Sequence, residues 1–148
     1  MFAHALVAID GSAQSDYALS QFLKIIDAKK TKVTVLYVIA PSRYVVIEEA
    51  PRYSGTPSLH ELRERLVQQE EETIRQRVKM ISLDECVPVE MIVRIGDPRD
   101  EILAVALEID VSLIVMGSTG KGLGKRILLG SVSTYVTAHS PISTMIIR

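Results

Sequence analysis

The amino-acid sequence predicts an α/β fold in which a five-stranded parallel, Rossmann-like sheet carries helices on both faces. Two observations predict it. Short apolar or β-branched segments alternate with segments of helical periodicity, in the order βαβ-loop-αβαβ-loop-αβ. Two of the strand segments, "FAHALVAID" and "VSLIVMG", are apolar almost throughout, as expected for strands that are covered on both faces. Such alternation is typical of parallel strands joined by right-handed crossovers.

Length and composition indicate a single domain over residues 1–148. A chain of 148 residues that is 47% hydrophobic and 24% charged can bury an ordinary core. It has one cysteine, Cys86, so neither an internal disulfide nor a cysteine-based zinc site can form. Its 17 basic and 18 acidic residues give a net charge of −1, which argues against nucleic acid as its main partner.

The sequence also predicts a soluble, cytoplasmic protein without a membrane partner. The first residues, "MFAHALVAIDGS", lack the basic start of a signal peptide. No apolar run approaches the roughly 18 residues that a membrane-spanning helix needs. A single cysteine suits a reducing compartment.

A strand, a helix and a second strand are expected before a long loop. The first strand covers residues 2–10, and Ser12 is a suitable N-cap for a helix over 12–30. The segment 32–39, "KVTVLYVI", is rich in β-branched residues and is typical of a strand. Residues 40–57 contain three prolines and one glycine, and we expect a loop there. The apolar residues that repeat at helical spacing in the first helix are Ala18, Phe22, Ile25 and Ile26.

The second helix has a sharp start. Ser58 and Glu61 have the spacing of a capping box, directly after a proline. A third strand follows over 87–95, where Glu90 and Arg94 alternate with apolar residues and indicate a partly exposed strand at a sheet edge. The residues expected on the apolar face of the second helix are Leu59, Leu62, Leu66, Ile74, Val78 and Ile81.

The last part of the chain repeats the strand–helix alternation. Asp97 is a good N-cap and Pro98 suits the first helical position. The expected elements are a helix through 101–109, a strand over 111–117, a helix from about Ser131 and a strand over 142–148.

This order of elements predicts where a ligand binds. In an open parallel sheet the ligand lies beyond the carboxyl ends of the strands, where the strand order reverses. If the first strand is central, with the second and third on one side and the fourth and fifth on the other, the cleft opens between strands 1 and 4. Asp10 and Gly11 end strand 1, and Met116 and Gly117 end strand 4.

A glycine-rich loop begins at this cleft. The segment "VMGSTGKGLGKRILLGSVS" (115–133) holds the cations Lys121, Lys125 and Arg126. It is not a Walker loop, because Val115 and Thr119 stand where that motif needs its first glycine. The dinucleotide pattern G-x-G-x-x-G also fails in every register. The glycines of the segment are Gly117, Gly120, Gly122, Gly124 and Gly130.

The loop nevertheless has the makings of a phosphate cradle. Glycine allows a backbone to approach a ligand closely. A helix that begins near Ser131 leaves its first N–H groups unpaired and directs its positive dipole end at an anion. The hydroxyls of Ser131 and Ser133 are expected to add donors.

The spacing of three glycines resembles the G-2x-G-9x-G-(S/T) signature of the ATP-binding branch of the universal stress protein family. Gly117, Gly120 and Gly130, followed by Ser131, match it, and the resemblance covers essentially the whole chain. "ALVAIDGSAQSDYAL", "VTVLYVI" and "GDPRDEILAVALEIDVSLIVMGSTGKG" resemble further segments of the family. The resemblance implies a five-stranded parallel sheet with four helices, usually in a dimer.

The same resemblance assigns ATP-binding roles. It implies that Gly117, Gly120, Gly130, Ser131 and Ser133 hold the phosphates and that Val132 makes a backbone contact in the same turn. It implies that Ala8, Asp10, Val38 and Met116 surround the adenosine end. Magnesium is expected to accompany ATP.

Bland interpretations stand beside these roles. The glycine loop could be merely flexible, its cations merely solvated, and Asp10 a turn residue. Tyr44–Ile47 could form a lid, a partner surface or ordinary packing. His4, His60 and His139 are too scattered to suggest a metal site or a catalytic base, and no catalytic residue is expected.

Three functions follow from the sequence. The first is a regulatory nucleotide-binding module in the stress response. The second is a slow ATPase or phosphotransferase at the same site, which would need a positioned water or acceptor and usually a base. The third is an interaction protein with a vestigial loop.

We also expect a homodimer through the last strand, because "STMII" has no proline or lysine to protect an open edge.

Overall fold

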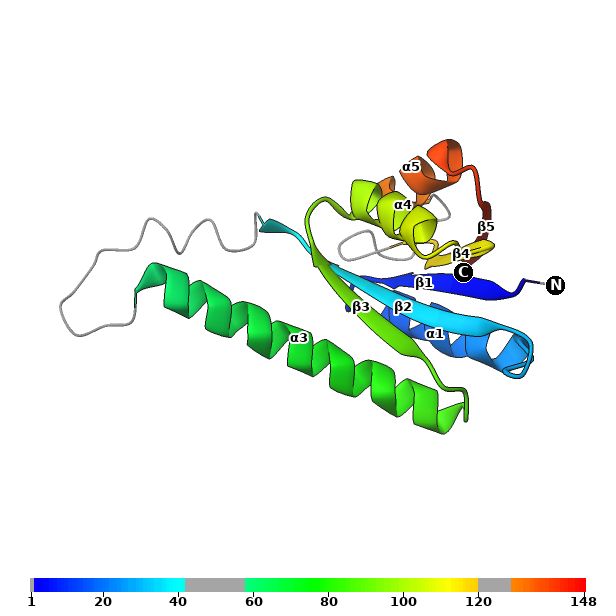
Figure 1. The fold of residues 1–148 in the computed structure, drawn as a ribbon, viewed down its shortest axis with the longest axis horizontal. Coiled ribbons are helices and arrows are strands. Elements are labelled where there is room, and N and C mark those ends of the chain that lie inside the picture. Colours follow the sequence, from blue (N-terminus) through cyan, green and yellow to red (C-terminus); the bar gives the residue numbers. More distant parts are fainter. Residues whose placement is uncertain (1, 42–57, 120–128) are drawn as a thin grey trace.

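The computed structural model, which describes residues 2–41, 58–119 and 129–148, contains one sheet of five parallel strands (Figure 1). The strand order is β3-β2-β1-β4-β5, with β1 in the centre. This confirms the predicted α/β fold class and the predicted strand order. The strands are β1 (His4–Ile9), β2 (Lys32–Ile39), β3 (Glu90–Ile95), β4 (Leu113–Gly117) and β5 (Ser143–Ile147).

In the part of the chain that the structure describes, two helices cover each face of the sheet. Figure 1 shows α1 and α3 on one face and α4 and α5 on the other. No helix in the described residues is both long and apolar enough to cross a membrane. Most of the expected loop over 40–57, the cations Lys121, Lys125 and Arg126, and Tyr44–Ile47 lie outside the described residues. The helices are α1 (Ala13–Ile25), α3 (Leu59–Asp84), α4 (Pro98–Glu108) and α5 (Ser131–His139).

Side chains cap three of these four helices where the sequence predicted caps. Ser12 accepts a hydrogen bond from the N–H of Ser15, and both halves of the Ser58 capping box are present. Asp97 accepts from the N–H of Arg99, with Pro98 in the first turn. The fourth helix, α5, begins after Gly130 and has no side-chain cap.

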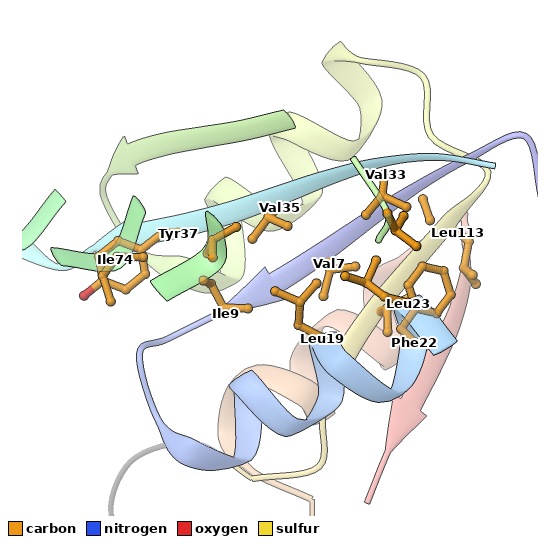
Figure 2. Close-up of a cluster of buried hydrophobic side chains, with 14 of the residues drawn as sticks. Val7, Ile9, Leu19, Phe22, Leu23, Val33, Val35, Tyr37, Ile74 and Leu113 are labelled. Carbon is orange, nitrogen blue, oxygen red and sulfur yellow. The ribbon is translucent and has the colours of Figure 1, made fainter. Parts of the chain in front are cut away.

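The core is divided by the sheet into two layers, because neighbouring residues of a strand point to opposite faces. Figure 2 shows the layer toward α1 and α3, a single buried cluster that runs from Ile74 of α3 beside Tyr37 to Phe22 of α1 near Leu23. The layer toward α4 and α5 contains Leu6, Leu36, Ile102, Ile114, Met116 and Val136. This second layer continues into the candidate site.

The structure corrects two residues of the predicted helix faces. Ile25 is 67% exposed and Leu62 is 39% exposed. Ile25 is the last residue of α1 and Leu62 lies in the first turn of α3. Helical spacing identifies residues on one stripe, but it does not determine how far along the helix the sheet covers that stripe.

The buried Phe22 and the exposed Ile25 of the same helix give a test of the described core. Phe22→Ala should lower the free energy of unfolding by about 3–5 kcal/mol, because Phe22 is 1% exposed and its removal leaves a cavity. Ile25→Ala on the same helix should change it by no more than about 0.5 kcal/mol. Urea denaturation of both variants measures this, and equal losses would contradict the described core.

Candidate functional site

A cavity of about 260 Å³ lies at the carboxyl ends of β1, β2 and β4, on the α4 and α5 side of the sheet. Its size is close to the lower end of the range of about 300–1,000 Å³ for small-molecule sites. The predicted site residues that line it are Ala8, Asp10, Val38, Met116, Gly117, Gly130, Ser131, Val132 and Ser133. The remaining predicted site residue, Gly120, lies outside the described residues.

The floor of the cavity is an apolar patch on three neighbouring strands. In the parallel register, Ala8 pairs with Leu36 on one side and with Met116 on the other. Val38 lies two residues beyond Leu36 and therefore on the same face. A patch of aliphatic side chains with few polar atoms suits a flat, weakly polar group.

Sequence reasoning missed several residues that line the cavity. Leu36 could have been found from the period of two, because it precedes Val38 by two residues on a strand. Ile102 lies one helical turn after Pro98, which also lines the cavity. The remaining lining residues are Ile9, Ser15, Ala40 and Thr119.

Asp10 lies in a tightly bonded turn between β1 and α1. Its Oδ1 accepts a hydrogen bond of 2.9 Å from the N–H of Ser12, and its own N–H donates to Ser15 Oγ at 3.3 Å. Ser15 Oγ in turn donates to the carbonyl of Ser12 at 3.0 Å. Gly11 has a φ of 79°, a left-handed conformation that favours glycine. Asp10 therefore has a structural role in the turn and also lines the cavity.

The N-terminus of α5 supplies the polar wall of the cavity. The first intrahelical hydrogen bond runs from the N–H of Thr134 to the carbonyl of Gly130, at 2.9 Å. The N–H groups of Ser131, Val132 and Ser133 precede it, and all three residues line the cavity. In the described part of the chain no side chain caps this helix, and its positive dipole end lies at the residues that line the cavity.

Two hydrogen bonds join the ends of the glycine-rich loop. The N–H of Gly130 donates to the carbonyl of Ser118 at 2.7 Å, and Ser133 Oγ donates to the carbonyl of Gly117 at 2.9 Å. Ser133 was expected to donate its hydroxyl to a ligand, but here that donor bonds to Gly117. The hydroxyl thus fixes α5 against the end of β4.

Gly117 is explained by packing on the opposite face of the sheet. A Cβ at this position would lie 3.3 Å from Cγ and 3.4 Å from the carbonyl oxygen of Gln14 in α1. A side chain would therefore meet the first helix. The backbone of Gly117 lines the cavity, but the absence of its side chain serves the contact with α1.

An aromatic and charged cluster joins α4 to α5 beside the site. The guanidinium of Arg99 lies 5.4 Å from the ring centroid of Tyr135, whose ring stacks on His139 at 4.0 Å. Arg99 Nη2 also donates to Asp97 at 2.8 Å, and this hydrogen bond lowers the pKa of the Asp97 carboxyl. The cluster ties together the first turn of α4 and the middle of α5.

Few of the described residues that line the cavity carry charge. Among the described residues that line it, Asp10 is the only ionisable side chain. The described residues also contain no group of three or more histidine, cysteine, aspartate or glutamate side chains arranged to hold a metal. His4, in β1, bonds to Thr34 Oγ1 at 2.8 Å, and burial together with the charge of Lys32 lowers its pKa.

Comparison with known proteins shows which family this chain belongs to. The family model described as "Universal stress protein family" matches residues 1–148. The chain belongs to the universal stress protein family. It is 33% identical over 153 residues to the universal stress protein YxiE of Bacillus subtilis, with both chains fully covered.

Two further comparisons agree with this membership of the universal stress protein family. A universal stress protein of Methanothermobacter thermautotrophicus is 32% identical over 136 residues, which cover 90% of this chain and 87% of the relative. The solved structure of the hypothetical protein MJ0577 superimposes with a TM-score of 0.78 at 28% identity, over 99% of this chain and 96% of the other.

The hydrogen bond between Ser133 and Gly117 gives a test of the site's framework. Ser133→Ala should lower the free energy of unfolding by about 1 kcal/mol, because it removes a buried hydroxyl donor from the Gly117 carbonyl. Ser131→Ala, at an exposed position two residues earlier, should change it by less than about 0.5 kcal/mol. Denaturant titration compares them, and equal effects would show that this hydrogen bond adds nothing.

Proposed function

We propose that this protein binds ATP, together with magnesium, in the cavity between the sheet and α5, and acts as a regulatory nucleotide-binding module in the stress response. One observation carries the proposal. An aliphatic floor and an uncapped helix N-terminus line the same cavity at the carboxyl edge of a parallel sheet. These two surfaces match the two chemically different parts of a nucleotide.

The aliphatic floor suits the nucleoside. Ala8, Val38 and Met116 form a surface on which a flat base can lie with loss of water from both partners. Leu36 and Ile102 extend this surface. Asp10 adds a carboxylate at its edge, whose oxygens suit either a ribose hydroxyl or magnesium.

The N-terminus of α5 suits the phosphates. Its first N–H groups belong to Ser131, Val132 and Ser133, and Gly130 leads into them with an extended backbone at φ −66° and ψ 165°. A favourable charge at such a helix end is worth about 0.3–1 kcal/mol. The G-2x-G-9x-G-S spacing assigns Gly117 and Gly120 to the same proposed phosphate site. Magnesium would neutralise part of the phosphate charge.

Two relatives with the same fold were solved with adenine nucleotides. One is a universal stress protein in complex with cAMP, with a TM-score of 0.63 and 21% identity. The other is an Arabidopsis thaliana member of the family with AMP bound, with a TM-score of 0.61 and 19% identity. At these identities the likeness concerns the fold, so the choice of ATP depends on the cavity and on the glycine spacing of this chain.

Binding, with ATP as a regulatory ligand, is the function that this geometry supports. Asp10 is the only acidic side chain among the described lining residues, and one of its oxygens already accepts the N–H of Ser12. A small-molecule ligand also fits a chain with a net charge of −1 better than a nucleic acid does. We propose a cytoplasmic location, which suits a protein with one cysteine.

ATP with magnesium should raise the melting temperature. A ligand at a hundred times its dissociation constant stabilises the folded state by about 2.7 kcal/mol. In a domain of this size each kcal/mol raises the melting temperature by roughly 2–4 °C. Thermal unfolding with and without millimolar ATP measures the shift, and isothermal calorimetry gives the affinity. No shift and no heat would overturn the proposed function.

Variants of Gly130 locate that binding. Gly130→Val should weaken ATP binding at least about tenfold, because a β-branched side chain would stand beside the first N–H groups of α5. Gly130→Ala should weaken it less. The far-UV spectrum must stay native in both variants, and unchanged affinity in Gly130→Val would place the nucleotide elsewhere.

We also propose a homodimer through β5. This strand is an edge of the sheet next to β4, and the side chains of its last four residues, from Thr144 to Ile147, are only partly buried. The carbonyl of Ile147 accepts the N–H of Ser118 at 3.1 Å and so points toward β4. Backbone groups of alternate residues point to opposite sides, so those of Thr144 and Ile146 point to the outer edge. Pairing with a second copy would satisfy them.

The orientation of these groups selects the variant that tests assembly. Ile146→Pro should yield a monomer, because it removes an N–H at the outer edge while leaving the donors toward β4 in place. Met145→Pro, by contrast, removes a donor toward β4 and should unfold the edge. Light scattering of wild type and Ile146→Pro reports the masses. A wild-type monomer at tens of micromolar, with or without ATP, would contradict the dimer.

A further inference from the structure

The turn that carries Asp10 is held from outside the site by an arginine of α3. Arg77 Nη1 donates to the carbonyl of Gly11 at 2.9 Å, and Arg77 Nη2 donates to the carboxylate of Asp16 in α1. One guanidinium therefore bonds to the residue directly after Asp10 and to the first turn of the helix that follows. Arg77 is 66 residues from Gly11 in the sequence, and it is not among the residues that line the cavity.

Arg77 extends from a firmly anchored part of α3. Its helical neighbours Ile74 and Val78 are 5% and 3% exposed and belong to the buried cluster between the sheet and α3. Figure 2 shows Ile74 in this cluster. Its own side chain is 41% exposed and that of Asp16 is 23% exposed, so the ion pair is partly shielded from water. The backbone from which Arg77 extends is thereby fixed by the core.

The contact acts on a peptide that determines where Asp10 lies. Gly11 adopts a left-handed backbone conformation. Because glycine has little intrinsic preference for one conformation, neighbouring contacts must hold the turn. On one side of it, Asp10 Oδ1 bonds to the N–H of Ser12 at 2.9 Å. On the other, the N–H of Asp16 bonds to the carbonyl of Ser12 at 3.1 Å. The Gly11 carbonyl and the Ser12 N–H belong to the same peptide group. Holding that carbonyl relative to Asp16 therefore stabilises both hydrogen bonds of Ser12, the one with Asp10 and the one with Asp16.

We infer that Arg77 is a positioning residue for the nucleotide site: by clamping Gly11 to Asp16 it holds the Asp10 carboxylate at the cavity. The inference rests on the proposed function. Its chemistry is that of a charged donor fork, because a planar guanidinium can bond at once to a carbonyl and to a carboxylate in a fixed geometry. A lysine provides the charge without that fork.

The first experiment compares two arginines of the same helix by calorimetry with ATP and magnesium. Arg77→Met should weaken ATP binding roughly tenfold, the size of effect of one charged hydrogen bond. Arg75→Met is the matched control, because Arg75 pairs with Glu71 at 2.8 Å one turn along α3 and should leave the affinity unchanged. The ATP affinity of Arg77→Lys should lie between that of wild type and that of Arg77→Met. Affinities are measured well below each variant's melting temperature.

A double-mutant cycle with Asp10 separates positioning from general destabilisation. If Arg77 acts through Asp10, Arg77→Met should change the affinity of an Asp10→Ala protein by less than about twofold, although it changes that of wild type roughly tenfold. Asp16→Asn serves as a second route if Arg77→Met does not fold, because it weakens the same clamp from α1. It should also weaken binding.

The outcomes distinguish this inference from the proposed function. Wild-type protein that gives no heat with ATP overturns both. Wild-type binding with unchanged affinity in Arg77→Met and Asp16→Asn overturns only the role of Arg77. The same holds if Arg77→Met and Asp10→Ala weaken binding additively, because Arg77 would then act independently of the Asp10 carboxylate.

Discussion

The parallel pairing of β1 with both β2 and β4 is the constraint on which the candidate site depends. Because all three strands run the same way, their carboxyl ends meet at one edge of the sheet. The register then sets Ala8 between Leu36 and Met116 and leaves the following turns to form the walls. A slip of one residue would turn these side chains to the other face, where α1 packs. The cavity is in this sense a consequence of the register of the core.

Hydrogen bonds within the protein preorganise the walls of the cavity. The bonds from Gly130 to Ser118 and from Ser133 to Gly117 fix the first turn of α5 at the end of β4. The bonds around Gly11 fix the first turn of α1 at the end of β1. Preorganisation of this kind lowers the ordering cost that a ligand must meet on binding. The site therefore draws its geometry from the same contacts that close the fold.

Local sequence signals were sufficient for the helices and strands, whereas lining residues such as Ala8, Val38 and Val132 came from the resemblance to the family. The alternation of helices and strands predicted a parallel sheet, and the strand order followed only on the condition that strand 1 is central. The caps at Ser12, Ser58 and Asp97 followed from hydroxyl and carboxylate residues before an apolar stripe. The ends of the helical stripes did not follow, since the exposure of Ile25 depends on where the sheet stops. Contacts between residues distant in sequence, such as that of Arg77 with Gly11, leave no local signal at all.

Two glycines of the glycine-rich segment, Gly117 and Gly130, lie in different physical surroundings. At Gly130 the chain enters a helix whose first-turn residues line the cavity, so a side chain at this position would stand beside that wall. At Gly117 an added Cβ would meet Gln14 on the opposite side of the sheet. The first glycine thus admits α1 close to β4, and α1 begins in the turn next to Asp10. A substitution at Gly130 would change the cavity at the N-terminus of α5. A substitution at Gly117 would change it through the packing of α1 against β4.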